Sequence, residues 1–346
     1  MHYFLGIDIG GTKSHALIAD ETGRAVGFGQ GGPGNHEVVG YGGLAAMLQL
    51  VTCQALAMAR IGIERIAGAG FGVAGYDWPS ELEPTLAAIR PLGLTAPIEV
   101  VNDTIIGLVA GAEAGWGVAV IAGTSNNCWG WDEHHRVGRV MGNGSEFGEN
   151  GGSAELVQRA KQAVAKAWTR RGPQTALTQA FVDLTGARSE ADLLEGLSQG
   201  YYDVGPEAAP LVFRIAEAGD PVAVEAIRWA GHELASLALG VIRQLGFETR
   251  SFEIVLVGSM YNGGPLLLEP MRNAVLAEAP AARLVQLTAP PVAGAVLLGL
   301  QAAGLPAQRL RQPLIASIRA LIGPEATNGS AQPAPQEELD AMGVIA

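Results

Sequence analysis

The chain has 346 residues, of which 48% are hydrophobic and 16% charged, and its formal net charge is −12 at pH 7. This length predicts two domains with ample material for a core. The acidic balance argues against nucleic acid or an anionic membrane surface as the main partner, so a small molecule is the better expectation.

Two cysteines, Cys53 and Cys128, lie far apart and form no metal-binding spacing, so the sequence predicts neither a disulfide framework nor a zinc site. The N-terminus shows no signal peptide, and no uninterrupted apolar run reaches the roughly 18 to 20 residues of a membrane span. We therefore expect a cytoplasmic protein with no membrane partner.

The first 112 residues predict the order β-β-β-α-β-α-β-α, a mixed sheet with helices. Short apolar runs separated by the turns GGTK and DETG are typical of an antiparallel meander, and apolar residues at helical spacing predict the first helix. The expected strands are 3–9, 14–19, 25–30, 63–73 and 98–101, and the expected helices are 41–61, 80–90 and 104–114.

The pattern then begins again, because the expected strands 117–122, 128–132 and 138–141 repeat the strand, turn, strand order of the N-terminus. The later elements are expected to be helices 154–168, 174–184, 190–199, 207–218 and 220–245, strand 252–257, helix 265–278, edge strand 283–286 and helix 291–303. After Pro306 a helix is expected up to residue 322, and the tail 323–346 is expected to be disordered.

Three glycine-containing turns each follow an apolar strand: IDIGGTKS, VIAGTSNN and LVGSMYNGG. In the first, Gly10 and Gly11 can adopt positive φ and expose backbone N–H groups. Thr12 and Lys13 add a hydroxyl and an ammonium, and Asp8 adds a carboxylate, a set that suits a phosphate with its metal. Alone, this turn is equally typical of a Gly-Gly hairpin. Three such turns in this order favour a phosphate site built from two facing halves.

With these motifs the sequence resembles the sugar kinase, Hsp70 and actin superfamily, and within it the BadF/BadG/BcrA/BcrD-type group, over about residues 4–300. The resemblance implies an α/β fold of two ribonuclease-H-like (actin-like ATPase) domains. Each would have a mixed five-stranded sheet, and an ATP and sugar cleft would lie between them. The N-terminal domain would comprise residues 1–112 and 291–322, and the C-terminal domain residues 113–290 with a helical insertion.

The resemblance also implies roles for individual residues. Those expected to bind ATP are Gly10, Gly11, Thr12, Lys13, Gly123, Thr124, Ser125, Gly258, Ser259 and Asn262. Asp103, at the end of VVND, would be the general base for the sugar hydroxyl, and Asp8 would hold Mg²⁺ through water. Each aspartate has another interpretation, because Asp103 precedes a helix that it could cap and Asp8 could simply brace the hairpin.

The expected sugar contacts are Asn35, Gly75, Asn102, Asp103, Glu146 and Glu149. One motif departs from the group, because relatives carry GDEGSG where residues 148–153 read GENGGS. The alignment puts Glu149 at the sugar-binding acid. Glu146 and Glu149 could both face the sugar, or one could cap the following helix. The sequence therefore leaves the identity of the sugar open.

We expect an ATP- and Mg²⁺-dependent kinase, a homodimer, that phosphorylates the 6-hydroxyl of N-acetylglucosamine or a related amino sugar. One alternative is an activator-type ATPase that transfers electrons through an iron–sulfur cluster, which requires cysteines placed to share that cluster. Another is a non-catalytic sugar sensor. The GFGVAG run at 70–75 formally permits a dinucleotide fold, but that fold leaves the second and third turns unexplained.

Overall fold

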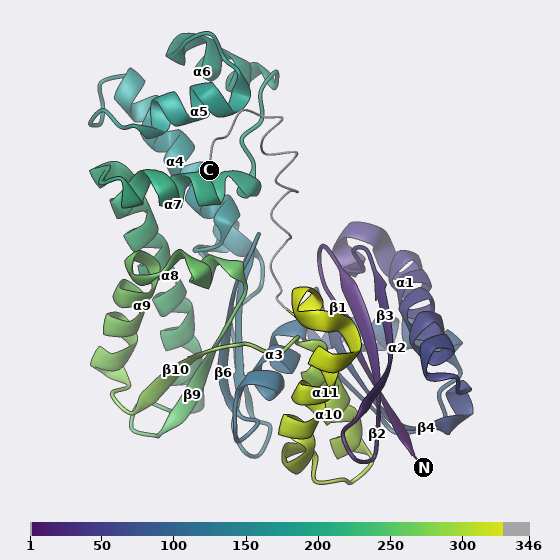
Figure 1. Ribbon diagram of the computed structural model, residues 1–346. Helices are drawn as coiled ribbons and strands as arrows, with labels where there is room; N and C mark the ends of the chain where they lie inside the picture. The colour runs from purple at the N-terminus through teal and green to yellow at the C-terminus, as the bar shows by residue number, and fades with distance from the viewer. Residues whose placement is uncertain (1, 328–346) are drawn as a thin grey trace.

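The computed structural model describes residues 2–327 and shows two halves, each built around a five-stranded mixed sheet with helices on its faces (Figure 1). The strand orders are β3-β2-β1-β4-β5 and β10-β9-β6-β7-β8. In each half the first three strands are neighbours in sequence order, and the fourth and fifth strands lie on the other side of the first. The strands are β1 (Tyr3–Ile9), β2 (Ser14–Asp20), β3 (Ala25–Gly31), β4 (Ile66–Val73), β5 (Ile98–Val101), β6 (Gly117–Ala122), β7 (Asn126–Trp131), β8 (Val137–Arg139), β9 (Phe252–Val257) and β10 (Ala282–Gln286). The repeat in the sequence is thus a repeat of the fold.

The helices also follow the expected order, with small shifts at their ends. They are α1 (His36–Ala59), α2 (Leu82–Ile89), α3 (Asp103–Gly111), α4 (Ser153–Trp168), α5 (Leu177–Thr185), α6 (Glu190–Gln199), α7 (Ala209–Glu217), α8 (Pro221–Leu245), α9 (Pro265–Glu278), α10 (Val292–Ala302) and α11 (Ala307–Thr327). Helix α1 begins at residue 36 rather than 41, because the chain continues through a non-helical break at Gly40. Helix α11 continues past residue 322 to Thr327, and the rest of the expected tail lies outside the described residues.

Helix α1 covers one face of the first sheet. Leu44, Leu48, Val51 and Ala55 recur at helical spacing and are fully buried in one cluster with side chains of β1, β2 and β4. Among the described residues, α1 is the one helix long and apolar enough to cross a bilayer by length and composition. Its buried stripe explains part of that apolar character, because these side chains form the core of the N-terminal half.

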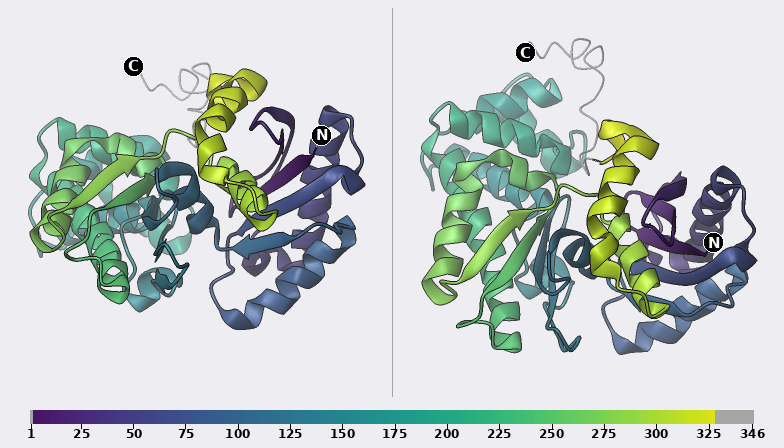
Figure 2. Two further views of the ribbon diagram at one scale, coloured as in Figure 1. Left: turned by 90° about the horizontal axis from the view of Figure 1, so that it is seen from below. Right: turned by 60° about the horizontal axis from the view of Figure 1, so that its bottom comes forward.

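The C-terminal helices return to the N-terminal half. Helix α10 lies directly on β1, where a Cβ atom on Gly6 would come 2.4 Å from the backbone nitrogen of Val296, so only glycine permits this approach. From α11, Ser317 Oγ accepts the Ala25 N–H at 2.9 Å and donates to the Gly23 carbonyl at 3.1 Å. The views of Figure 2 agree that the yellow helices lie beside the first sheet rather than the second.

Helices α8 and α9 pack in the C-terminal half, and α4 to α7 form a helical group beyond its sheet (Figure 1). Helix α8 buries twelve residues along its length and ends at Gly246, which has φ 69°. One core cluster joins side chains of β6 and β9 to this helical group. The insertion is therefore packed onto the domain that carries the second and third glycine-containing turns.

Candidate functional site

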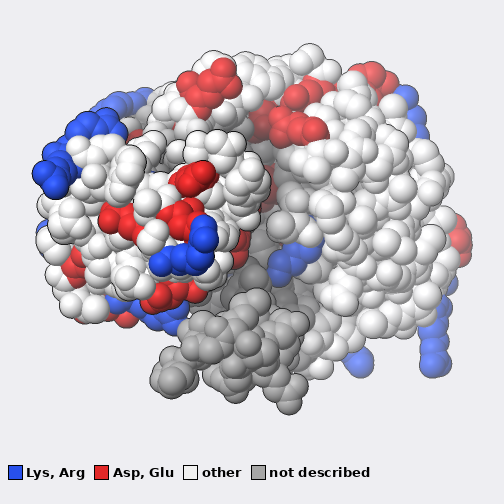
Figure 3. All heavy atoms as spheres, turned by 90° about the horizontal axis from the view of Figure 1, so that it is seen from above, with Lys and Arg blue, Asp and Glu red and all other residues white. Residues whose placement is uncertain are grey.

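Three of the predicted segments lie at one edge of the first sheet, because each contains or follows the carboxyl end of one of three parallel strands. Strands β1, β4 and β5 run parallel, and Gly72 of β4 is the register partner of both Asp8 and Val101. Adjacent strands are about 4.8 Å apart, so Asp8 and the end of β5 are separated by roughly 10 Å. Ligands of open α/β sheets bind at such carboxyl ends. Figure 3 shows a face that is hollowed between the two halves, with acidic side chains on its rim.

The first turn is an open hairpin end. The Gly10 N–H donates to the Lys13 carbonyl at 3.0 Å, and a Cβ atom on Gly10 would lie 2.7 Å from that carbonyl oxygen. Neither Gly10 nor Gly11 uses the positive φ that glycine permits, and glycine is required at position 10 because a Cβ atom would lie too close to that carbonyl. Gly11, Thr12 and Lys13 are exposed, and nothing lies within 4 Å of a Cβ position on Gly11. The turn thus leaves room for a ligand.

Asp8 lies at the end of β1, opposite His15 across the hairpin. His15 Nδ1 is 3.9 Å from Asp8 Oδ2, and the Asp8 side chain is 15% exposed. The described residues hold no group of three His, Cys, Asp or Glu side chains that could bind a metal. A single accessible carboxylate beside an open glycine-containing turn nevertheless fits Mg²⁺, which usually takes one or two carboxylates and completes its shell with water and substrate phosphate.

The second turn is positioned by helix α4. The Ser153 and Ala154 N–H groups donate to the carbonyls of Gly123 at 2.9 Å and of Thr124 at 3.1 Å. These bonds use two of the unpaired donors at the start of the helix, so the turn and the helix are tied together. The Thr124 and Ser125 side chains stay exposed, and a Cβ position on Gly123 is open.

The third turn follows β9 and lies against the second. Gly258 has φ 114°, and a Cβ atom there would be 2.3 Å from the Ala122 carbonyl oxygen at the end of β6. Ser259 begins a short 3₁₀ helix, and Asn262 Oδ1 accepts a hydrogen bond from Gln286 Nε2 at 3.0 Å. Glycine is therefore required where the third turn meets the carboxyl end of β6.

Asp103 is the first residue of α3, and it is not the helix cap. That role belongs to Asn102, whose Oδ1 accepts the Thr104 N–H at 2.9 Å, so the interpretation of Asp103 as an N-cap was wrong. The Asp103 side chain is half-buried. Burial, and then the carboxylates of Asp8 and Asp77, raise its pKa to about 8. A carboxylate with this pKa is a much stronger proton acceptor than an ordinary aspartate.

Two of the expected sugar residues use their polar groups within the protein. Asn102 is 1% exposed, and its Nδ2 donates to Asp77 Oδ1 at 3.1 Å and to the Tyr76 carbonyl at 3.3 Å. Asn35 caps α1, with its Oδ1 accepting from the Glu37 N–H at 2.9 Å. Gly75 has φ 80°, and a Cβ atom there would lie 2.4 Å from Asn35 Oδ1. Asn35 and Gly75 are therefore brought together, whereas Asn102 lies beneath the surface.

The two acids of the departing motif have different environments. Glu149 is 7% exposed and accepts from the backbone N–H groups of Met141 at 2.5 Å, Asn143 at 2.9 Å and Gly144 at 3.3 Å. Its carboxylate is thus used to hold its own loop. Glu146 is exposed. Neither acid caps α4, because Glu155 fills that role by accepting the Gly152 N–H at 2.9 Å.

Sequence reasoning missed a polar contact between the halves. Asp77, in the turn after β4, is 7% exposed, and burial followed by Glu37 and Glu81 raises its pKa to about 6. Arg139 of β8 and the side chain of Asn127 of β7 act in the opposite direction. The signal available in the sequence was an acid inside GVAGYDWP, directly after an apolar strand.

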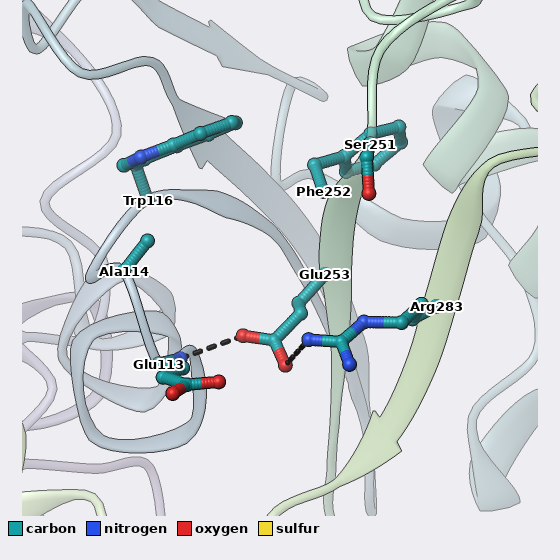
Figure 4. A pocket seen from close by; sticks show the side chains of 7 residues that line it. All are labelled: Glu113, Ala114, Trp116, Ser251, Phe252, Glu253 and Arg283. Atoms are coloured by element: carbon teal, nitrogen blue, oxygen red, sulfur yellow. Dashed lines mark hydrogen bonds and ion pairs between the residues drawn. The ribbon is translucent and has the colours of Figure 1, made fainter.

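A separate pocket of about 200 Å³ lies at the amino ends of β9 and β10 (Figure 4). Glu253 occupies its centre, where it accepts the Glu113 N–H at 2.6 Å and pairs with Arg283 at 2.8 Å. The third glycine-containing turn lies at the opposite end of β9, and this pocket contains none of the predicted site residues.

Comparison with known proteins agrees with this arrangement. An N-acetylmuramic acid/N-acetylglucosamine kinase of Clostridium acetobutylicum is 26% identical over 301 residues, covering 86% of this chain and 98% of that relative. An N-acetyl-D-glucosamine kinase of Dictyostelium discoideum is 25% identical over 320 residues, covering 86% and 97%.

Solved structures share the fold. A Chromobacterium violaceum protein, 21% identical, superposes with a TM-score of 0.63 and covers 86% of this chain and 99% of its own. A ROK family glucokinase of Streptomyces griseus, solved with glucose and AMPPNP, is 21% identical with a TM-score of 0.54, covering 87% and 99%. The two-domain, actin-like ATPase fold expected from the sequence is confirmed. Residues 5–299 match the BadF/BadG/BcrA/BcrD ATPase family, and the chain belongs to this family.

Proposed function

We propose that this protein is an ATP- and Mg²⁺-dependent kinase that phosphorylates the 6-hydroxyl of N-acetylglucosamine or a related amino sugar. The observation that carries the proposal is Asp103, a carboxylate of raised pKa at a parallel strand end beside an open glycine-containing turn. The names of the two curated relatives support an amino sugar as the substrate.

In this proposal, catalysis depends on positioning and electrostatics. Exposed Thr12, Lys13, Thr124 and Ser125 bind the phosphates from two sides. Asp103 orients the sugar hydroxyl and accepts its proton as the bond to phosphorus forms. Asp8 would hold Mg²⁺, which when bound neutralises charge on the transferring phosphoryl group. Approach of the two halves excludes water, so hydrolysis without sugar stays slow.

The sugar site is proposed to lie between Asn35 with Gly75 on one side and the 141–149 loop on the other. Because the Glu149 carboxylate is used by three backbone donors, we assign the loop's direct contact with the sugar to exposed Glu146. The relative from Clostridium acetobutylicum is named for two amino sugars, and we include N-acetylmuramic acid among the candidate substrates.

The iron–sulfur alternative is disfavoured by the two cysteines. Cys128 is buried in β7, where burial raises the pKa of its thiol, and only Cys53 is exposed. A four-cysteine cluster shared by two copies would need two accessible cysteines from each. A non-catalytic sugar sensor would not need a proton acceptor, so it gives no role to the raised pKa of Asp103.

We also propose a cytoplasmic homodimer. The outer face of α1 supports the dimer, because residues 38–59 include no charged side chain, and Val38, Leu50 and Met58 are 71%, 47% and 52% exposed. Such a face suits association with an equally uncharged face of a second copy. The acidic net charge offers no attraction to nucleic acid or to an anionic membrane.

The proposed function is tested by a coupled ADP-release assay with MgATP. The sugars are N-acetylglucosamine, glucosamine, N-acetylmannosamine, N-acetylmuramic acid and glucose. We expect sugar-dependent release with at least one amino sugar, and phosphorus NMR of the product should show a 6-phosphate. Release at the no-sugar rate with every sugar would refute the kinase proposal.

A further inference from the structure

A stacked arginine joins the two halves of the molecule. The guanidinium carbon of Arg139, from the C-terminal half, lies 4.2 Å from the ring centroid of Trp78 in the N-terminal half. The same carbon is 5.2 Å from the ring centroid of Trp129 in β7. Both distances are within the range of cation–π attraction. Arg139 thus contacts one indole from each half.

Asp77, the residue before Trp78, is a buried carboxylate with partners from both halves. From its own half it accepts from Asn102 Nδ2 at 3.1 Å. From the other half it receives a hydrogen bond from Asn127 and the charge of Arg139, and a Cβ atom on Gly142 would lie 2.8 Å from Asp77 Oδ1. Glu37 and Glu81 oppose its charge, so the stabilising cation comes from across the interface.

Asp77 determines how the amide of Asn102 is oriented. With Nδ2 donating to Asp77 and to the Tyr76 carbonyl, Oδ1 must face the start of α3, where it accepts the Thr104 N–H at 2.9 Å. That bond fixes the first turn of the helix, in which Asp103 is the first residue. A change at Asp77 therefore reaches Asp103 through one buried side chain.

In the C-terminal half, Glu149 holds the loop that contacts Asp77. Its carboxylate holds the N–H groups of Met141, Asn143 and Gly144, and this loop carries Gly142 against Asp77. Gly142 has φ 81°, a conformation that glycine adopts without strain. The acid that departs from the related motif thus supports the loop that meets Asp77.

We propose that Asp77 is a positioning residue that aims Asp103 through Asn102, and that Arg139 and the Glu149-held loop stabilise it when the two halves are together. Approach of the halves then completes the catalytic site. This inference rests on the proposed kinase function, and it adds a physical link between domain closure and the base. Opening the halves removes Arg139 and Asn127, and leaves Asp77 with two acidic neighbours.

The first test compares Asp77→Ala, Asp77→Asn and a control, Asp20→Ala. Asp20 is similarly buried in the same half, but in the described part of the chain its carboxylate accepts bonds from Thr22 and Arg24 of its own hairpin. Asp77→Ala should lower kcat about ten- to hundredfold, the value of a hydrogen bond to a charged group, with less than about a threefold change in KM for ATP. Asp77→Asn keeps an acceptor and should recover most of the loss. An equal loss in the control, or no recovery in the asparagine variant, would overturn the proposal.

The second test uses double variants. Glu149→Gln and Arg139→Gln should each lower kcat, and neither should lower it further in the Asp77→Ala background. Additive losses would mean that these side chains act independently of Asp77. Because Glu149 also holds the loop that carries Glu146, KM for the sugar is compared in Arg139→Gln, where it should change little; a raised KM there would mean that Arg139 acts on sugar binding rather than through Asp77. Either result would overturn the link.

A third measurement does not depend on activity. Hydrogen exchange at the amides of residues 104–106 should be faster in Asp77→Ala than in the wild type and unchanged in the Asp20→Ala control. If the wild type releases no ADP with any sugar, the kinase proposal fails, while this comparison still tests the link. Equal exchange in the wild type and Asp77→Ala would overturn it.

Discussion

Replacing Asp103 by asparagine should abolish sugar phosphorylation and at the same time stabilise the protein. The pKa of Asp103 rises from an ordinary 3.8 to about 8, through burial and the carboxylates of Asp8 and Asp77. Folding therefore favours the protonated acid, and the wild type loses stability as the pH rises from about 4 to about 8. Asparagine keeps the shape and does not titrate, so it avoids this loss.

The expected gain can be worked out from that shift. A difference of roughly four pKa units at about 1.4 kcal/mol each gives an upper limit of about 6 kcal/mol, reached above pH 8. Because the side chain is half-buried, water reduces the cost, and we expect about 2–3 kcal/mol. For a chain of this size that corresponds to a rise in Tm of about 3–4 °C.

The assay is thermal unfolding of both proteins from pH 4 to pH 8.5 in EDTA, beside ADP release at pH 7.5. The Tm difference should be near zero at pH 4 and grow steadily to pH 8. The control is Asp132→Asn. Burial acts to raise the pKa of Asp132, but the N–H groups of Arg136 and His134 hold it below its usual value. This variant should lose stability at neutral pH and not at low pH. A flat or negative difference for Asp103→Asn would refute the reasoning.

Three further substitutions test other parts of the structure. Gly75→Ala places a side chain at φ 80° and 2.4 Å from Asn35 Oδ1, so the free energy of unfolding should fall by about 1–3 kcal/mol and KM for the sugar should rise. An unchanged KM would mean that this turn is not part of the sugar site. Leu50→Glu puts a charge on the outer face of α1 and should convert a dimer to a monomer in light scattering, whereas a dimer that persists would place the interface elsewhere. Arg311→Ala removes donors to the Ala110 and Gly111 carbonyls at the end of α3 and should lower the free energy of unfolding by about 1.5–3 kcal/mol. The same change at exposed Arg309 should lower it little, and equal melting curves of the two variants would refute this role.

Much of the fold could be predicted from local signals. Strands such as β1 and β6 are apolar runs that end at glycine-containing turns, and α8 has a proline at its first turn with Asp220 as its cap. The second half could be recognised because it repeats the order of the first. These features depend on residues close together in sequence, which periodicity and capping rules describe well.

The orientation of polar side chains could not be predicted in this way. Whether Asn102 or Asp103 caps α3 depends on a contact with Asp77, which is 25 residues away in the chain. Glu149 aligned with a sugar-binding acid, yet backbone donors of its own loop use its carboxylate. Glycine at position 10 permits a positive φ, but the close Lys13 carbonyl is what requires glycine there. Each of these depends on tertiary contacts that motif spacing does not encode.

The return of α10 and α11 to the first sheet has a consequence for biosynthesis. Strand β1 leaves the ribosome first, but the helix that covers it is made about 290 residues later, and such distant contacts form slowly. The C-terminal half is continuous in sequence and has its own core cluster, so it can fold during translation while the N-terminal sheet waits for its cover. Until α10 emerges, one face of that sheet stays open to chaperones. The C-terminal half can therefore fold before the N-terminal half, although it is synthesised later.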